Sequence, residues 1–282
     1  MLDNALLLSE FTNVTNSVFE WREAPVGDFA VIGSPIHHSL SPRMHQAAFD
    51  ALGLSAGYHA IHVPIGEVAQ ALDHLASLGY RGVNVTVPHK EAAYEWAKSH
   101  TEIAADLRVC NTLELEIGKG HNTDVVGIQS CLEHLGVTHG KALVLGAGGS
   151  ARAAVYALSR AGLEVALWNR TQARAEELAT SLSEPVYVMP SPDLAGFDIA
   201  VNTTSVSLVG ESLPLDWAQA KPGLVVFDLA YAEGLTPLLA DAVSHGYGVL
   251  DGRRMLMEQG AAAFEIWWQQ PAPRDAMLEA IS

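Results

Sequence analysis

The stretch KALVLGAGGSARAAVYALSRAGLEVALWNRT, residues 141–171, predicts a strand, a glycine turn, a helix and a second strand. An apolar run at 142–145 ends abruptly in a G-x-G-x-x-A turn. Small residues recur at helical spacing from Ala153 to Leu158, and a second apolar run follows at 165–168. A strand–turn–helix–strand unit of this length is typical of folds that bind a dinucleotide.

Each small residue of the turn has its own physical reason. Gly146 permits the tight turn, Gly148 lets the backbone approach a pyrophosphate, and Ala151 lets the helix pack closely on the strand. The start of the helix presents N–H groups and the positive end of its dipole to the phosphates. The predicted phosphate cradle consists of Gly146, Ala147, Gly148, Gly149, Ser150 and Ala151.

The end of the second strand indicates which dinucleotide is bound. NAD sites usually place an Asp or Glu there to hold the ribose 2′-hydroxyl. This chain has Asn169, Arg170 and Thr171 instead, with Arg174 one helical turn further on. Guanidinium groups can bind a phosphate bidentately. An arginine in the first turn of a helix opposes the helix dipole, so a bound anion explains these arginines better than helix stability does. These four residues favour NADP over NAD.

The composition excludes several classes of protein. The 282 residues suffice for two domains, and 49% hydrophobic with 17% charged residues indicates a compact globular enzyme. A formal net charge of −16 argues against binding to nucleic acids or anionic membrane surfaces. An anionic substrate must therefore be held by local groups.

The sequence also predicts a cytoplasmic location. It shows no secretory signal and no apolar run long enough to cross a membrane. Cys110 and Cys131 lack C-x-x-C spacing and fit small buried hydrophobes in a reducing compartment. The scattered histidines show no metal-ligand spacing, so no metal site is predicted.

Strands and helices alternate on both sides of residue 125, which predicts two α/β units. Residues 1–27 have no clear period and are interpreted as an N-terminal extension. Three polar turns between strands and helices are the default ligand sites, because ligands bind beyond the carboxyl ends of strands. These turns contain Ser39 and Ser41, residues 84–90, and residues 122–124.

Position alone leaves the roles of these residues open. Ser41 followed by Pro42 predicts a helix start with Ser41 as its N-cap. Lys90 lies just inside another helix start, where a solvated lysine is as consistent as a functional one. Asp124 suits a helix cap.

Taken together, the motifs resemble the shikimate dehydrogenase family over about residues 28–270. Nine motifs match in order: GSPIHHSLSP (33–42), GVNVTVPHK (82–90), CNTL (110–113), HNTDVVG (121–127), GAGGSARA (146–153), NRTQAR (169–174), VNTTS (201–205), DLAYAEGLTPLL (228–239) and DGRRMLMEQGAAAFEIW (251–267).

The resemblance implies a two-domain α/β enzyme that interconverts 3-dehydroshikimate and shikimate with NADP(H). Residues 1–125 and 255–282 would form the substrate-binding domain. Residues 126–254 would form a Rossmann-type, doubly wound NADP-binding domain, with a cleft between the two. The expected partner is the small-molecule substrate, and the sequence does not distinguish a monomer from a homodimer.

The resemblance also implies roles for individual residues. Lys90 and Asp124 look like the catalytic pair. Thr204, Ser205 and Gly252 look like further contacts to the cofactor. Implied substrate contacts are Ser39, Ser41, Asn84, Thr86, Asn111, Tyr231 and Gln259.

These residue types suit the chemistry. An ammonium group can protonate the alkoxide that forms when a ketone accepts hydride, and a neighbouring carboxylate can orient it. Neutral Asn, Thr and Ser side chains suit a polyhydroxylated ring, and a site of buried polar groups rejects analogues that leave those groups unpaired.

Three positions depart from the family pattern. Val206-Ser207-Leu208 stands where x-Gly-Met is common, Arg253-Arg254 replaces small residues, and Gln46 replaces an Asn. Two alternatives therefore remain open: a dehydrogenase for quinate or another shikimate-like polyol, and a non-catalytic homologue that binds a metabolite. The presence of both Lys90 and Asp124 argues against the second.

Overall fold

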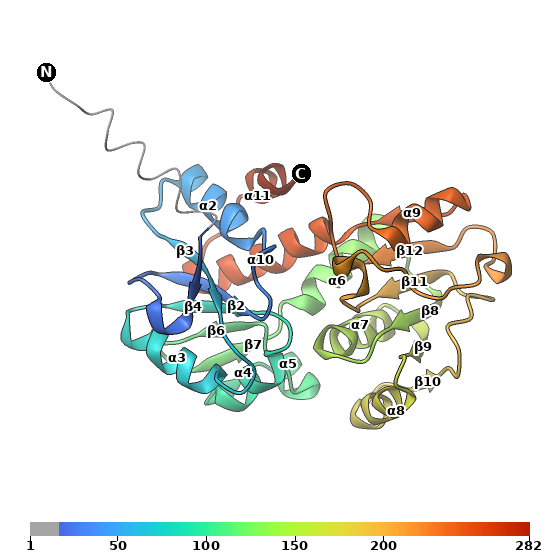
Figure 1. The fold of residues 1–282 in the computed structure, drawn as a ribbon, viewed down its shortest axis with the longest axis horizontal. Coiled ribbons are helices and arrows are strands. Elements are labelled where there is room, and N and C mark those ends of the chain that lie inside the picture. The colour runs from blue at the N-terminus through green and yellow to red at the C-terminus, as the bar shows by residue number, and fades with distance from the viewer. Residues whose placement is uncertain (1–16) are drawn as a thin grey trace, which may run out of the picture. The chain divides into compact units, whose positions relative to one another are not determined.

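The structure is a computed structural model that describes residues 17–282, in two compact units. The first unit contains the described residues up to Thr123 together with Gly260–Ser282, and the second contains Asp124–Gln259. Each unit is an α/β domain with its own sheet, as predicted (Figure 1).

The first unit is built on a seven-stranded sheet in the order β1-β3-β2-β4-β6-β7-β5. Strands β1, β3, β2 and β4 run parallel, whereas β6 is antiparallel to both β4 and β7. The strands are β1 (Val18–Glu20), β2 (Phe29–Gly33), β3 (Tyr58–His62), β4 (Gly82–Val85), β5 (Ser99–His100), β6 (Thr112–Glu114) and β7 (Lys119–His121).

The predicted N-terminal extension is wrong for part of its length. Val18–Glu20 joins the sheet beside β3, with Val18 opposite Ala60. The short 3-10 helix η2 (Trp21–Glu23) follows, and the Trp21 indole donates to the Glu67 carboxylate at 2.7 Å. A three-residue strand is too short to show a period in the sequence. Residues 1–16 of the predicted extension lie outside the described residues.

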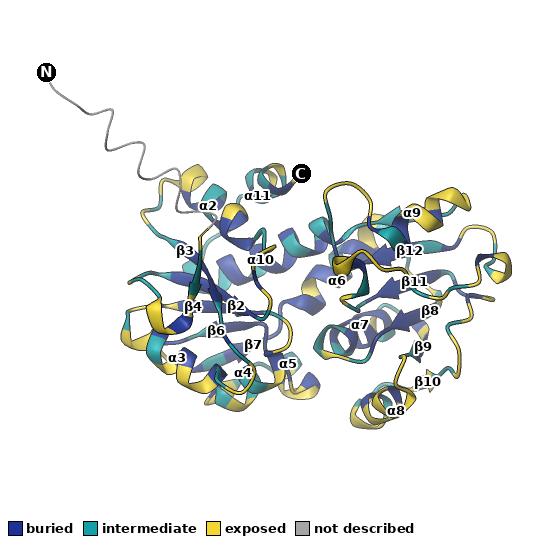
Figure 2. Ribbon diagram, in the orientation of Figure 1, coloured by how far each residue is buried: buried dark blue, intermediate teal, exposed yellow. Residues whose placement is uncertain are grey.

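Helices cover both faces of this sheet (Figure 1). Alternate residues of β2 explain the two layers: Ile32 joins a core cluster with Leu72 of α3, whereas Phe29 stacks on Trp267 of α10 at 4.8 Å. The central strands β2 and β4 are buried, and the outer faces of the helices are exposed (Figure 2). The helices are α2 (Ser41–Leu52), α3 (Val68–Ser77), α4 (Lys90–Trp96), α5 (Glu102–Leu107), α10 (Gly252–Trp268) and α11 (Arg274–Ile281).

The second unit is a six-stranded parallel sheet in the order β10-β9-β8-β11-β12-β13. Numbered from its first strand this is 3-2-1-4-5-6, the doubly wound order of dinucleotide-binding domains. The order reverses between β8 and β11, which places a ligand-binding crevice at their carboxyl ends. The strands are β8 (Gly140–Leu145), β9 (Leu163–Trp168), β10 (Val186–Val188), β11 (Ile199–Asn202), β12 (Val225–Asp228) and β13 (Gly248–Leu250).

Helices of the second unit follow its strands in alternation. Helix α9 packs with β8 and β12 in one apolar cluster that includes Leu143, Val226 and Leu238. The helical segments are α6 (Asp124–Leu135), α7 (Gly149–Arg160), α8 (Gln172–Ser181), η3 (Val206–Val209), η4 (Trp217–Gln219), α9 (Pro237–Ser244) and the first part of α10.

Candidate active site

The predicted substrate contacts of the first unit lie where strands of its sheet end. Asn84 is in β4 and Thr86 follows that strand, while Asn111 directly precedes β6. Because β6 is antiparallel to β4 and β7, its start lies beside the ends of both neighbours. Thr112 of β6 is opposite Asn84, and Thr123 follows β7. The topology therefore gathers these polar residues at one edge.

Hydrogen bonds join the two asparagines into one buried network. Asn84 Nδ2 donates to Thr112 Oγ1 at 3.0 Å and to the Asn111 carbonyl at 3.3 Å. Asn111 Oδ1 accepts from the Thr123 N–H at 2.7 Å, and Asn111 Nδ2 donates to Thr123 Oγ1 at 2.9 Å. Both asparagines are at most 4% exposed. Such a network fixes the orientation of both amides.

Ser39 lies in the turn between β2 and α2, whereas Ser41 is the first residue of α2 and not its cap. Helix α2 begins at Ser41 itself, its N-cap is Leu40, and no side chain of the cap residue bonds to it. Ser39 Oγ accepts from the Ser41 N–H at 3.3 Å instead. The predicted capping role of Ser41 is wrong because the helix begins one residue earlier than its Ser-Pro signal indicated.

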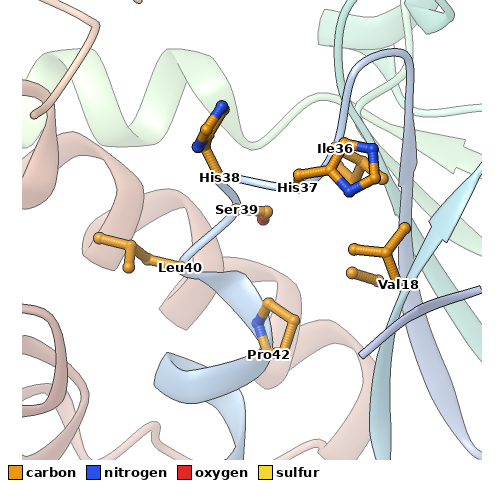
Figure 3. Close-up of a pocket in the computed structure, with 8 residues that line it drawn as sticks. Val18, Ile36, His37, His38, Ser39, Leu40 and Pro42 are labelled. Atoms are coloured by element: carbon orange, nitrogen blue, oxygen red, sulfur yellow. The ribbon is translucent and has the colours of Figure 1, made fainter. Parts of the chain in front are cut away.

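The turn borders a cavity of about 350 Å³ in the first unit. Figure 3 shows Ser39 between His38 and Pro42, with His37 and Val18 of β1 to its right. Ser39 is the one predicted contact in this lining, so the cavity does not extend over Asn84 or Asn111. The lining residues are Val18, Ile36, His37, His38, Ser39, Leu40, Pro42 and Ala60.

Lys90 is the first residue of α4 and is 8% exposed. Its carbonyl accepts from the Cys110 N–H at 3.0 Å, which ties the helix start to the segment before β6. The preceding His89 bonds through Nε2 to the Val63 carbonyl at 2.7 Å. Burial lowers the pKa of His89, although that bond opposes the shift. The backbone at Lys90 is therefore tied to the segment before β6 and, through His89, to the residue that follows β3.

Asp124 is the first residue of α6 and is 3% exposed. It opens the second unit, directly after Thr123 of the buried network, whereas Lys90 belongs to the first. A carboxylate in the first turn of a helix is favoured by the helix dipole. The two predicted catalytic residues thus come from different units.

A histidine–tyrosine stack supports the network in the first unit. The ring of His45 lies 4.3 Å from that of Tyr58 with an interplanar angle of 5°. His45 is fully buried, and neither of its ring nitrogens has a partner among the described residues. Desolvation lowers the pKa of His45 to about 3, so the ring is neutral.

We expect this histidine to destabilise the protein in mild acid. The unfolded chain protonates His45 near its ordinary pKa of 6.5, whereas the folded protein does so only near pH 3. Below about pH 6.5 the unfolded state therefore binds a proton that the folded state does not. This difference lowers the free energy of unfolding by about 2 kcal/mol at about pH 5.

Urea unfolding of wild type and His45→Phe from about pH 8 to about pH 5 measures this contribution. The phenyl ring keeps the stack on Tyr58 but does not titrate. The stability of the wild type relative to the variant should fall by about 2 kcal/mol over that range. If the free energy of unfolding changed with pH in the same way for wild type and variant, His45 would take up its proton equally in the folded and unfolded states.

The glycine turn of the second unit has the geometry of a phosphate cradle. Gly146 has a φ of 117° and its N–H donates to the Trp168 carbonyl at 2.8 Å. A Cβ at Gly148, by contrast, would have no atom within 4 Å, so the space beside this backbone is open. Helix α7 begins at Gly149 without a side-chain cap, and Ala151 is fully buried. These residues fit a dinucleotide pyrophosphate at the start of α7.

The predicted contacts Thr204 and Ser205 lie beside this turn. A Cβ on Gly146 would be 2.5 Å from Thr203 Oγ1 and 3.0 Å from Thr204 Cγ2, so β8 and β11 end close together. Thr204 Oγ1 donates to Asn202 Oδ1 at 2.7 Å. The strand order reverses between β8 and β11, and doubly wound folds bind a dinucleotide at such a reversal.

The residues expected at the ribose phosphate follow β9. Asn169 Nδ2 donates to the Thr171 carbonyl at 2.9 Å, which shapes the turn into α8. Arg170, Thr171 and Arg174 are exposed. Neither guanidinium forms an ion pair with a carboxylate of residues 17–282. Two unpaired cations beside the glycine turn fit a 2′-phosphate.

Ser207, one departure from the family pattern, anchors the short helix η3. Its hydroxyl donates to Asp228 Oδ2 at 2.6 Å, and that oxygen also accepts from Thr236 Oγ1 at 2.7 Å. Asp228 Oδ1 accepts from Asn202 Nδ2 at 2.8 Å and from the Ala230 N–H at 3.0 Å. Burial raises the pKa of Asp228, against the effect of these bonds. The carboxyl group holds together the ends of β11 and β12.

Arg253, a second departure, fastens the loop that carries Tyr231. Its Nη2 donates to the Ala232 carbonyl at 2.5 Å, and its Nη1 pairs with Asp251. Gly252 donates its N–H to the Ala230 carbonyl at 3.0 Å. Tyr231 is half-buried.

The side chains of two glutamines named in the sequence analysis, Gln259 and Gln46, each form a hydrogen bond. The predicted contact Gln259 is buried in α10, and its Nε2 donates to the Leu256 carbonyl at 2.9 Å. Gln46, the third departure, forms an exposed helix pair with Asp50 at 2.9 Å.

Sequence reasoning missed several residues of these networks. Tyr58 and Thr112 both bond to Asn84, and Asp228 organises the second unit. Thr123, which bonds to Asn111, belongs to the predicted ligand turn 122–124. For Tyr58, a signal was available: a tyrosine in an apolar strand needs a partner for its hydroxyl once buried.

Residues 17–282 show no cluster of three or more metal-ligating side chains. No helix among them is long and apolar enough to span a bilayer. Cys110 and Cys131 are unpaired, and burial raises the pKa of each thiol to about 12.

Three family models match the chain in order. They are the shikimate dehydrogenase substrate binding domain at residues 31–113, the shikimate / quinate 5-dehydrogenase model at residues 129–231, and the shikimate 5'-dehydrogenase C-terminal domain at residues 252–281.

Individual relatives resemble the chain over nearly its whole length. An NADP(+) shikimate dehydrogenase of Natronomonas pharaonis is 39% identical over 264 residues, 90% of this chain and 97% of the relative. The shikimate dehydrogenase structure from Aquifex aeolicus has a TM-score of 0.84 at 36% identity, covering 91% of this chain and 97% of that one. The shikimate 5-dehydrogenase of Thermus thermophilus, in complex with NADP(H) and shikimate, has a TM-score of 0.82 at 37% identity, covering 90% and 97%.

Proposed function

Because the chain belongs to the shikimate dehydrogenase family, we propose that it is an NADP-dependent oxidoreductase that interconverts 3-dehydroshikimate and shikimate. The similarity to the Thermus thermophilus enzyme, whose structure contains both NADP(H) and shikimate, carries the proposal. This reaction belongs to the shikimate pathway, which leads to chorismate and the aromatic amino acids. We assign NADP binding to the second unit and substrate binding mainly to the first, with Tyr231 and Gln259 as the proposed substrate contacts that belong to the second unit.

In this proposal the second unit holds the cofactor with the groups described above. The turn from Gly146 to Ala151 binds the pyrophosphate, and Arg170 with Arg174 binds the 2′-phosphate. Residues Asn169, Thr171, Thr204, Ser205 and Gly252 complete the contacts. NADPH supplies the hydride when it is bound.

The chain's own residues hold the substrate and move the proton. Ser39 and Ser41 hold the carboxylate, while the remaining predicted contacts face the ring and its hydroxyls. Lys90 donates a proton to the alkoxide oxygen as the ketone is reduced, and accepts it in the reverse direction. Asp124 orients that lysine and the reacting hydroxyl. The buried asparagine network supports this assignment, because fixed neutral donors and acceptors suit a polyhydroxylated ring.

Substrate identity is tested by incubating the protein with NADP+ and either shikimate or quinate, and identifying the products. We expect NADPH and 3-dehydroshikimate from shikimate, and much slower turnover of quinate. Preferential turnover of quinate would assign the chain to a catabolic role instead. No turnover of shikimate or quinate would contradict the proposal. We also expect a cytoplasmic enzyme, monomeric or homodimeric, consistent with its two free thiols.

Replacing Ser39 by alanine should raise KM for shikimate about ten- to a hundred-fold. A hydrogen bond to a charged group contributes about 1.5–3 kcal/mol, and each 1.4 kcal/mol is tenfold in affinity. An analogue with a hydroxymethyl group in place of the carboxylate is the control. It should be a poor substrate for the wild type and should scarcely worsen in the variant. An equal loss for analogue and shikimate would remove Ser39 from the carboxylate site.

A further inference from the structure

Tyr58 lies against two predicted substrate contacts on different elements. Its hydroxyl group donates to Asn84 Oδ1 at 2.6 Å, and the Ser41 side chain is close enough to the phenol to lower its pKa. Ser41 begins α2 after β2, whereas Asn84 is in β4. Tyr58 is 4% exposed, so its bond to Asn84 is shielded from water. One side chain therefore lies beside both a residue proposed to hold the carboxylate and one proposed to meet the ring hydroxyls.

The chemistry of the groups fixes the direction of these bonds. An amide oxygen can only accept, so the phenol donates its proton to Asn84 Oδ1. With its proton committed, the phenol oxygen can act toward the nearby Ser41 hydroxyl only as an acceptor. Both N–H groups of the Asn84 amide are directed at Thr112 Oγ1 and the Asn111 carbonyl. Asn84 can then meet a substrate hydroxyl only as an acceptor.

The ring itself is held in place from its face. His45 stacks on it almost in parallel, one helical turn after Ser41 on α2. Burial raises the pKa of Tyr58 far above its ordinary value, so the phenol keeps the proton that it donates.

We propose that Tyr58 is a positioning residue of the substrate site, which fixes the hydrogen-bond direction of Asn84 and its spacing from Ser41. The proposal rests on the proposed function, because those two residues are assigned to the substrate there. Tyr58 itself acts through them.

Tyr58→Phe removes the hydroxyl group that donates to Asn84 and lies near Ser41, and it keeps the ring on His45. We expect kcat/KM for shikimate to fall about tenfold, since a mispositioned site loses roughly one hydrogen bond to the substrate, while KM for NADP+ stays unchanged. Tyr80→Phe is the matched control. Tyr80 is also buried in the first unit, 3% exposed, and its hydroxyl bonds to His59 Nδ1 at 2.9 Å. This control should lower the melting temperature comparably without changing the kinetics for shikimate.

A double-mutant cycle separates positioning from general destabilisation. If Tyr58 acts through Ser41, then Ser41→Ala should cost much less in the Tyr58→Phe background than in the wild type. Should Tyr58→Phe fail to fold, a cycle between Ser41→Ala and Asn84→Ser asks the same question. Tyr58 joins these two residues, so their effects should not be additive.

Three results would overturn the proposal. The first is that Tyr58→Phe and Tyr80→Phe have the same kinetics for shikimate. The second is that the effects of the two substitutions add in whichever double-mutant cycle is measured.

In both of these cases the proposed function stands as long as the wild type turns over shikimate. The third result, a wild type without shikimate turnover, would overturn the proposed function and this inference together.

Discussion

Replacing Lys90 by alanine is expected to lower kcat by about 10²–10⁴-fold, with a far smaller change in KM. The proton transfer assigned to Lys90 takes place only in the transition state, so its loss leaves ground-state binding largely intact. The lysine is 8% exposed at the start of α4, which leaves few alternative proton donors from solvent. Steady-state kinetics with shikimate and NADP+ measure the effect.

Lys98→Ala provides the control, because Lys98 is an exposed lysine of the same unit. Its kinetics should match those of the wild type. If kcat of Lys90→Ala fell less than about fivefold while KM rose, Lys90 would be a binding residue and the acid–base assignment would be wrong.

Replacing Arg170 and Arg174 by glutamine should weaken NADP+ binding and leave NAD+ nearly unaffected. Only NADP+ carries the 2′-phosphate, and each charge-assisted bond lost should reduce affinity about ten- to a hundred-fold. Both guanidinium groups are exposed and follow β9, whose Trp168 carbonyl accepts from the glycine turn. Titration of each cofactor into wild type and variant measures the dissociation constants.

Arg160→Gln is the matched control, since Arg160 is an exposed arginine at the far end of α7. Its affinity for both cofactors should be that of the wild type. An equal loss for NADP+ and NAD+ in the double variant would show that Arg170 and Arg174 support the fold rather than select the cofactor.

The second unit could be predicted from the sequence because its signals are local. The turn from Gly146 to Ala151 and its flanking strands lie within one short segment, and the period of the apolar residues identifies each element. The doubly wound strand order then follows from the expected dinucleotide-binding fold, and the structure confirms it.

The connections of the first unit could not be predicted in the same way. Asn84 meets Thr112 because β6 turns back antiparallel to β4, a pairing between residues 28 positions apart. Tyr58 of β3 meets Asn84 of β4 through strand order, which no local pattern specifies. The strand Val18–Glu20 was missed because three residues show no period, and the N-cap of α2 was misplaced by one residue. Element boundaries are set by hydrogen bonds that the sequence does not reveal.

The central claim is that this chain transfers a hydride between shikimate and NADP+. Shikimate that carries deuterium at the carbinol carbon oxidised in the reaction tests it most directly. After incubation of the protein with this substrate and NADP+, mass spectrometry of the cofactor should find NADPH that carries the deuterium, in equal amount to the 3-dehydroshikimate formed. Reduced cofactor without deuterium, or no reduced cofactor at all, would contradict the account.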